Sequence, residues 1–211
     1  MATESKQSNY EITKANMASV FLRHDQAKMI QKFGLAHNTE YLFVHFIGRD
    51  YRIDRSTGAV SWSENGFQTE VPAGHNEVMT IYDVLCCPKD APKLAGQWVN
   101  VASLSPIRGG TLSKGSFFEN AGAAFDGKAE QLGRACEELK GQKLKKGDVA
   151  YELDMFSFLP IALHFWNSDE DFPASLQIFV DQNILDFMHY ETLMFAITHL
   201  LDLLKAKCGM E

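Results

Sequence analysis

Three segments near the C-terminus carry apolar side chains at every second residue, which is the period of a β-strand with one buried face. They are residues 149–154, 158–166 and 176–180. An apolar repeat close to the heptad follows, formed by Leu193, Ile197, Leu200 and Leu204. That repeat predicts a C-terminal helix with one apolar face, and the predicted sheet is the largest surface available to cover it.

The rest of the chain alternates between helical and strand signals. Asp25 is a predicted N-cap and Gly34 a predicted stop for one helix, and Asn76 is a predicted N-cap for another. Gly48 and Arg49 are expected to reverse the chain between two strands. Helices are expected in two pieces over 8–33, over 76–88, and in two pieces between 116 and 141; strands are expected over 40–62 and 96–104.

These patterns predict an α+β fold as a single domain over residues 1–211. The sheet is expected to be mainly antiparallel or mixed, with helices packed on it and a helix at the C-terminus. A chain of 211 residues that is 45% apolar and 22% charged is able to bury a substantial core.

Charge and cysteine content exclude several classes of function. A net charge of −7 argues against general nucleic-acid binding, which requires a basic surface. The polar N-terminus lacks a signal-peptide core, and the longest apolar stretches are too short to span a bilayer, so no membrane association is expected. The four cysteines form no CxxC pair, which favours a cytoplasmic protein with free thiols and without an iron–sulfur cluster of its own.

An acidic stretch separates two of the predicted strands. Asp169, Glu170 and Asp171 lie within "NSDEDFPA" (167–174), whose Asn, Ser, Asp and Pro residues are typical of a turn. A hard-cation site is the alternative, because carboxylates suit Ca²⁺ or Mg²⁺. Three consecutive side chains diverge, however, so the turn interpretation is favoured.

Among the polar groups, the best candidate cluster is Asp186, His189 and Glu191, just before the last helix. Capping of that helix is the simpler account. His199 and Asp202 are assigned to the solvent-facing side of the same helix. The seven histidines show no HExxH or His-x-His spacing, so no metal site is expected.

Three further groups of residues have weaker functional interpretations. "GGTLSKGS" (109–116) lacks the Walker order, although Arg108 and Lys114 near a helix start at Ser116 make a candidate anion-binding loop; a flexible surface loop is the favoured interpretation. The tryptophans, including Trp98, lie in strand-like contexts and are expected to pack in the core. The lysine-rich stretch 140–148 is expected to be a solvated turn.

The motifs of the C-terminal half resemble the domain-of-unknown-function family 3786 of anaerobic bacteria and archaea. Residues 46–54 and 96–110 also resemble it. The motif residues are Gly147-Asp148, Leu159-Pro160, Trp166, Glu170-Asp171, Phe172-Pro173 and Asp181.

The resemblance implies no established activity. Some members carry an added four-cysteine domain like that of corrinoid iron–sulfur proteins, a motif that this chain lacks. Relatives often have His-Tyr where this chain has Asp186 and Phe187.

Two classes of function follow from these observations. The first is a non-catalytic binding or accessory protein that holds an organic cofactor or a protein partner in anaerobic redox or one-carbon metabolism. The second is an enzyme with acid–base groups from Asp186, His189 and the 169–171 carboxylates. The first is preferred, because no pair of nucleophile and base and no set of metal ligands is recognisable in the sequence. The sequence does not identify the cofactor.

Overall fold

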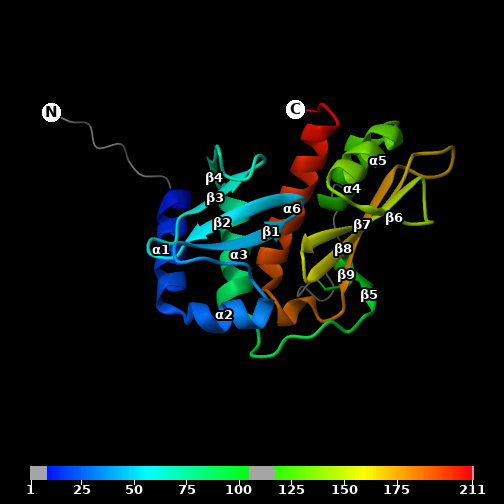
Figure 1. The fold of residues 1–211 in the computed structure, drawn as a ribbon. Coiled ribbons are helices and arrows are strands. Elements are labelled where there is room, and N and C mark those ends of the chain that lie inside the picture. The colour runs from blue at the N-terminus through cyan, green and yellow to red at the C-terminus, as the bar shows by residue number, and fades with distance from the viewer. Residues whose placement is uncertain (1–8, 105–116, 211) are drawn as a thin grey trace.

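A computed structural model describes residues 9–104 and 117–210 (Figure 1). It confirms the α+β fold, with a sheet in which all described strand pairs are antiparallel. The strands are β1 (Tyr41–Phe46), β2 (Arg49–Asp54), β3 (Val60–Ser63), β4 (Val71–Pro72), β5 (Trp98–Asn100), β6 (Gln142–Lys143), β7 (Val149–Phe156), β8 (Leu159–Trp166) and β9 (Ser175–Asp181). The helices are α1 (Asn9–Arg23), α2 (Gln26–Phe33), α3 (His75–Cys86), α4 (Phe117–Phe125), α5 (Ala129–Glu138) and α6 (Tyr190–Lys207), with short 3₁₀ turns at Val101–Leu104 and Ile184–Asp186.

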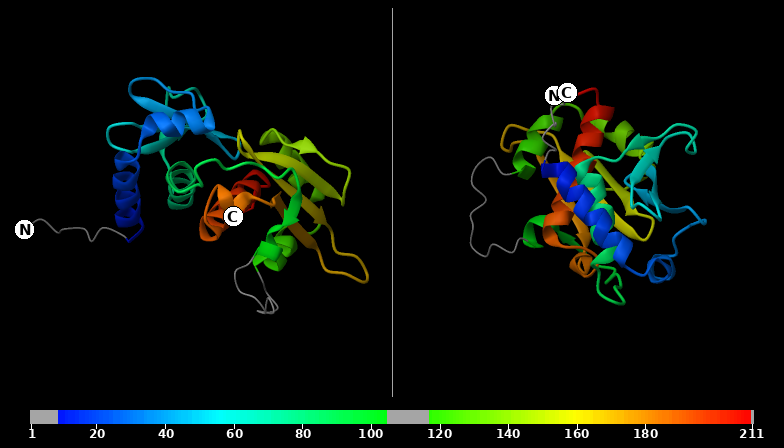
Figure 2. Two further views of the ribbon diagram at one scale, coloured as in Figure 1. Left: turned by 90° about the horizontal axis from the view of Figure 1, so that it is seen from below. Right: turned by 90° about the vertical axis from the view of Figure 1, so that its left-hand side faces the viewer.

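The sheet has two halves with a narrow junction. Its strand order is β4-β3-β2-β1-β7-β8-β9-β5, with β6 added along β7. Strands β1 and β7 pair only at Phe46 and Phe156, and the Ile47 N–H donates to the Met155 carbonyl beside them. The halves bend around α6, which lies between them (Figure 2). Helix α6 therefore belongs to the core of both.

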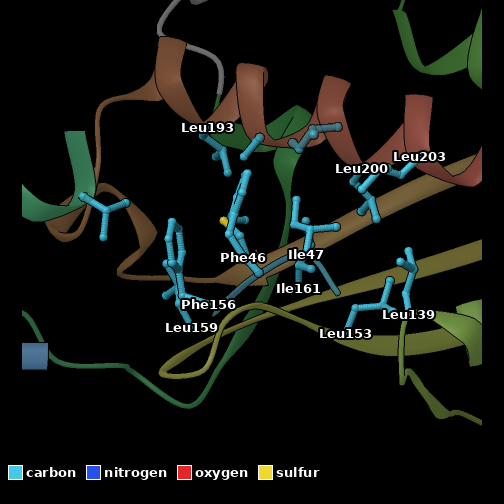
Figure 3. Close-up of a cluster of buried hydrophobic side chains, with 14 of the residues drawn as sticks. Phe46, Ile47, Leu139, Leu153, Phe156, Leu159, Ile161, Leu193, Leu200 and Leu203 are labelled. Atoms are coloured by element: carbon cyan, nitrogen blue, oxygen red, sulfur yellow. The ribbon is translucent and has the colours of Figure 1, made fainter. Parts of the chain in front are cut away.

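The apolar face of α6 packs on the sheet as the heptad-like repeat predicts. Leu193, Leu200 and Leu203 point toward Phe46, Ile47 and side chains of the C-terminal half (Figure 3). All four residues of the predicted stripe are buried. Helix α3 contacts both α1 and α6, whereas α4 and α5 pack on β9 and β7. The strand predicted over 158–166 is confirmed as β8, an interior strand between β7 and β9.

Local capping signals are confirmed at one helix and corrected at another. The Asp25 carboxylate accepts the N–H groups of Ala27 and Lys28 at the start of α2, and Gly34 ends that helix with φ 61°. Helix α3 instead begins at His75, one residue before the predicted cap Asn76.

The start of α3 is stabilised from within the helix. Gly74 is its N-cap, and the Glu77 carboxylate reaches back to accept the Gly74 N–H. A glycine at the cap leaves room for that carboxylate oxygen, which lies 2.8 Å from where a Cβ would be. This bond from Glu77 is the side-chain contact at the start of α3, in place of the expected asparagine cap.

The β1–β2 reversal lies one residue earlier than predicted. Ile47 and Gly48 form the turn, with φ of 44° and 71°, and Arg49 already belongs to β2. Positive φ is costly for a β-branched residue, but Ile47 is buried at the junction of the two halves. A Cβ at Gly48 would lie 2.6 Å from Leu139 of the other half, so glycine is required there.

The strand expected over 96–104 is also shorter than predicted. Only Trp98–Asn100 pairs with β9, and the chain then enters a 3₁₀ turn.

Among the helices of the described ranges, none combines the length and the apolar character needed to cross a bilayer.

Candidate functional site

The outer face of the C-terminal half-sheet carries a hollow of about 440 Å³. Side chains alternate along β8, so Ile161, Leu163 and Phe165 point toward α4, α5 and α6 while Ala162 and His164 point away. The hollow is lined by Trp98, Leu144, Lys145, Lys146, Ala162, His164 and Phe179. Its volume is in the range of small-molecule sites.

Three aromatic rings, those of Trp98, His164 and Phe179, form part of the wall of this hollow. The His164 and Phe179 rings lie 4.6 Å apart between centroids, and Trp166 meets His164 edge-on at 6.1 Å. Trp98 is 44% exposed, so the expectation that it packs in the core is wrong. It lies on β5, which is the last strand in the order of the sheet over the residues that the structure describes.

His164 contributes a neutral ring rather than a charge. Burial, and next the positive charge of Lys146, lower the pKa of His164 below its ordinary value. The imidazole is therefore uncharged at neutral pH and is able to donate or accept a hydrogen bond at the edge of the hollow.

Two of the family-like motif residues hold the loop that carries Lys145 and Lys146. Gly147 has φ 57°, and a Cβ there would lie 2.5 Å from the Phe165 carbonyl oxygen, so only glycine allows this approach to β8. The Asp148 carboxylate accepts the Asn167 N–H at 2.7 Å, which ties the loop to the far end of β8.

A third motif residue fixes the opposite wall. The buried Asp181 carboxylate accepts the N–H groups of Ala95 and Gly96 at 2.9 and 2.8 Å. Burial raises the pKa of Asp181, but the backbone N–H donors outweigh it, so the pKa lies below the ordinary value and the group stays ionised. These bonds hold the segment that leads into Trp98.

The outer face of the N-terminal half carries a second hollow of about 400 Å³ with a different character. Phe33, Phe43, Phe67 and Phe158 line it, and its polar pair is His45 with Asp50, whose Nδ1 and Oδ1 atoms are 2.8 Å apart. No lysine or arginine is among its lining residues in the described part of the chain. An anion therefore has no cationic partner there.

The candidate cluster before α6 is assembled differently from the prediction. His189 is the N-cap of α6; its N–H donates to Asp83 Oδ2 at 2.8 Å, and its Nδ1 lies 2.7 Å from Asp83 Oδ1. Asp186 instead pairs with Lys89 at 2.7 Å, and Glu191 is exposed in the first turn of α6. The partner of His189 is thus Asp83 of α3, a pairing that the sequence did not predict.

Cys87 lies next to this pair. It follows Asp83 by one helical turn at the end of α3, and side-chain ligand atoms of Asp83, Cys87 and His189 all lie within 4.8 Å of one another. Burial, and then the neighbouring Asp83 carboxylate, raise the pKa of the Cys87 thiol to about 11.

The acidic stretch forms the predicted turn. Asp169 Oδ1 accepts the N–H groups of Asp171 and Phe172, and the Asp169 N–H donates to the Phe172 carbonyl. Glu170 and Asp171 are exposed. The turn lies at the β8–β9 end of the sheet, away from the start of α6 (Figure 1). The fold therefore does not bring these carboxylates to His189.

A cluster of polar side chains lies in the interior, where α3, α6 and the sheet meet. The Tyr51 hydroxyl donates to Glu77 Oε1 at 2.5 Å, Arg49 reaches the same oxygen at 3.4 Å, and His199 Nε2 lies 3.7 Å from it. His199 is buried, so its assignment to the solvent face of α6 is wrong. Its ring stacks on Phe46 at 5.3 Å, and apolar cover on that side explains the burial.

The remaining candidates, Arg108, Lys114 and Ser116, lie outside the described residues. Local sequence did contain a signal for the hollow, namely two lysines directly before the Gly147-Asp148 motif. By itself the stretch is typical of a solvated turn, because the aromatic side chains Trp98 and Phe179 of the hollow are more than 30 residues away along the chain.

Comparison with known proteins gives one match. No curated protein and no solved structure is detectably similar to this chain. A family model described as "Domain of unknown function (DUF3786)" matches residues 25–202, which is most of the chain. The match includes both walls of the hollow and the Asp83, Cys87 and His189 cluster. On this evidence the chain belongs to the domain-of-unknown-function family DUF3786.

Proposed function

We propose that this protein is a non-catalytic binding protein that holds a planar, anionic organic ligand in the hollow between Trp98, Phe179 and His164. The observation that carries the proposal is the combination of an aromatic wall with Lys145 and Lys146 at the rim of one 440 Å³ hollow. Ligand pockets are mostly apolar, with a few polar groups that set orientation.

Each part of the hollow favours one feature of such a ligand. Exposed Trp98 offers an indole face for stacking, and Phe179 offers a second ring on the neighbouring strand. Ala162 of β8 pairs with Phe179, and its small side chain leaves depth beside that ring. Lys145 and Lys146 supply positive charge for a carboxylate or phosphate, in a protein whose net charge is −7.

The family resemblance extends the proposal to cellular context. An organic cofactor of anaerobic redox or one-carbon metabolism fits the ligand class. We further infer a reducing compartment such as the cytoplasm, which four free cysteines support. The acidic balance of the chain disfavours nucleic acid as a partner.

The enzymatic alternative has less support from the geometry. Its acid–base groups were to come from Asp186, His189 and the turn at 169–171. Asp186 pairs with Lys89, His189 contacts Asp83, and the turn lies at another end of the sheet. General acid–base catalysis requires such groups to converge on one reacting atom.

Fluorescence titration tests the proposal with a defined probe, the planar anion 1-anilinonaphthalene-8-sulfonate. The Trp98→Ala variant and the Lys145→Glu/Lys146→Glu variant should each bind it at least about tenfold more weakly than the wild type, as expected for a lost stacking or charge contact of about 1.4 kcal/mol. Lys28→Glu/Lys32→Glu on α2 is the matched charge control and should bind as the wild type does.

The second hollow provides the contradicting outcome. If Phe43→Ala removes probe binding while Trp98→Ala does not, the ligand site is on the N-terminal half and the proposal is wrong. Native mass spectrometry and an absorption spectrum of anaerobically purified protein would identify a retained ligand. Stoichiometric iron and sulfide in that preparation would contradict the expectation of no iron–sulfur cluster.

A further inference from the structure

Two helices that are distant in sequence bring three different metal-binding side chains together. Asp83 and Cys87 are four residues apart and share one face of the end of α3, and His189 precedes α6. Their ligand atoms lie within 4.8 Å of one another. The set offers one oxygen, one sulfur and one nitrogen donor.

We propose that Asp83, Cys87 and His189 bind a divalent cation of the zinc class, with solvent completing the coordination. This inference is independent of the ligand proposed for the hollow. It also reverses the expectation of no metal site, which considered only spacing along the sequence.

The donor set selects the class of cation. Thiolate and imidazole ligands suit zinc and its neighbours, whereas Ca²⁺ and Mg²⁺ prefer oxygen. Bonds of about 2.0–2.3 Å in a tetrahedral site place ligand atoms about 3.3–3.8 Å apart. Ligand atoms at the 4.8 Å limit therefore have to close by about an ångström, whereas His189 Nδ1 and Asp83 Oδ1, now 2.7 Å apart, have to separate slightly; rotation of the exposed Cys87 and His189 side chains allows both.

Helix capping by Asp83 does not explain the whole arrangement. Capping uses one carboxylate oxygen, Oδ2, which accepts the His189 N–H. The second oxygen faces His189 Nδ1, and Cys87 lies beside them although capping does not require a thiol there. Asp83 is only 7% exposed, so a buried carboxylate forms the base of the site.

Access and proton balance are both consistent with metal entry. The His189 side chain is 69% exposed and Cys87 is exposed, so an ion reaches the carboxylate directly from solvent. The ion displaces the thiol proton of Cys87 and any second proton on the His189 ring, and both protons are released to water. The bound ion would tie the end of α3 to the start of α6.

Cobalt(II) is the direct probe, because a Co²⁺–thiolate bond gives charge-transfer absorption that oxygen and nitrogen ligands alone do not. Anaerobic titration of the full chain, with a non-chelating phosphine reductant, should reach one Co²⁺ per chain with this band. Zn²⁺ should displace Co²⁺ and raise the Tm of the wild type, since a ligand selective for the native state stabilises it.

Matched variants separate the site from other thiols. Cys87→Ala should remove the charge-transfer band. Cys87→Ala and His189→Ala should each weaken Zn²⁺ binding at least about 100-fold, because each removes a ligand of the ion; loss of an outer-shell contact would weaken binding less. Cys86→Ala removes the adjacent thiol and should behave as the wild type. Lys145→Glu/Lys146→Glu should also leave Zn²⁺ binding unchanged, so a failure here is distinct from a failure of the hollow.

Three outcomes would overturn the proposal. They are a charge-transfer band that persists in Cys87→Ala, a band that depends on Cys86, and Zn²⁺ affinity that is equal in the wild type and His189→Ala. Cys87 and His189 are preferred to Asp83 for the test because both are exposed, and circular dichroism confirms that each variant is folded.

Discussion

The seam between α3 and α6 carries two carboxylate–histidine pairs with opposite environments. Glu77 and His199 lie at one end, where both side chains are at most 10% exposed and Tyr51 donates to the same carboxylate. Asp83 and His189 lie at the other end, where the carboxylate is buried but the imidazole is open to solvent.

The comparison shows that burial of the histidine, rather than the identity of the two paired residues, determines what each pair is able to do. At the inner pair, burial lowers the pKa of His199 to about 4, despite the opposing charge of Glu77. The ring is neutral and enclosed by Phe46 on one face. At the outer pair the imidazole is exposed to solvent and lies near the Cys87 thiol. The inner pair is therefore structural, and the outer pair is available for ligand binding.

The largest expected effect distinguishes the two ends directly. Glu77→Ala removes the acceptor of the Gly74 N–H and the short bond of the buried Tyr51 hydroxyl, which keeps only a 3.4 Å contact with His199 Nε2. We expect a loss of about 3–5 kcal/mol in the free energy of unfolding, measured by urea denaturation. His189→Ala at the outer pair should cost less than about 1 kcal/mol. Equal losses in the two variants would remove the distinction.

The second prediction concerns the apolar core that α6 shares with the sheet. Leu200 on α6 and Leu163 on β8 are both buried. Leu200→Ala and Leu163→Ala should each cost about 2–5 kcal/mol, because each leaves a cavity. Lys205→Ala, further along α6, should be nearly silent. Melting of both leucine variants within a degree of the wild type would contradict the packing of α6 on the sheet.

The third prediction uses the pH dependence of the inner pair. The folded-state pKa of His199, about 4, lies below its ordinary value of about 6.5, so the unfolded chain binds the proton more tightly. Stability should therefore fall as pH drops from about 6.5 to about 4, by up to about 3 kcal/mol, and this contribution should level off below that range. His199→Gln should lack this part of the pH dependence. Parallel wild-type and variant curves over that range would show that His199 does not titrate as proposed.

The smallest expected effect is at the acidic turn. Asp169→Asn keeps an oxygen that accepts the Asp171 and Phe172 N–H groups, and Glu170 is exposed. The double variant Asp169→Asn/Glu170→Gln should change stability by less than about 1 kcal/mol, and Ca²⁺ should not shift the wild-type Tm. A calcium-dependent rise in Tm that the double variant lacks would restore the cation-site alternative for this turn.

Local features of the fold were predictable because their causes are local. The two-residue period of β8, the apolar stripe of α6 and the Asp25 and Gly34 caps depend on residues within a few positions of one another. The errors occurred where a distant contact decided the outcome. Ile47 adopts positive φ because the other half of the sheet buries it, and Gly48 is required because Leu139 lies against it.

Both candidate sites depended on the same long-range packing. His189 was identified from sequence as a polar group near a helix start, but its partner Asp83 is 106 residues away. Trp98 was placed in the core because strand-like surroundings do not reveal that β5 is an edge strand. The spacing of residues along the chain does not indicate which distant side chains contact each other across a sheet or between two helices.

The sequence by itself therefore determined the class of fold, the order of most elements and the turn at 169–171, because hydrophobic period, capping and turn chemistry act between near neighbours. Only the tertiary structure decided which of two similar carboxylate–histidine pairs is excluded from solvent, and which residues line a hollow together with Lys145 and Lys146. Burial is a property of the whole packed chain, and burial sets both the pKa of His199 and the accessibility of His189.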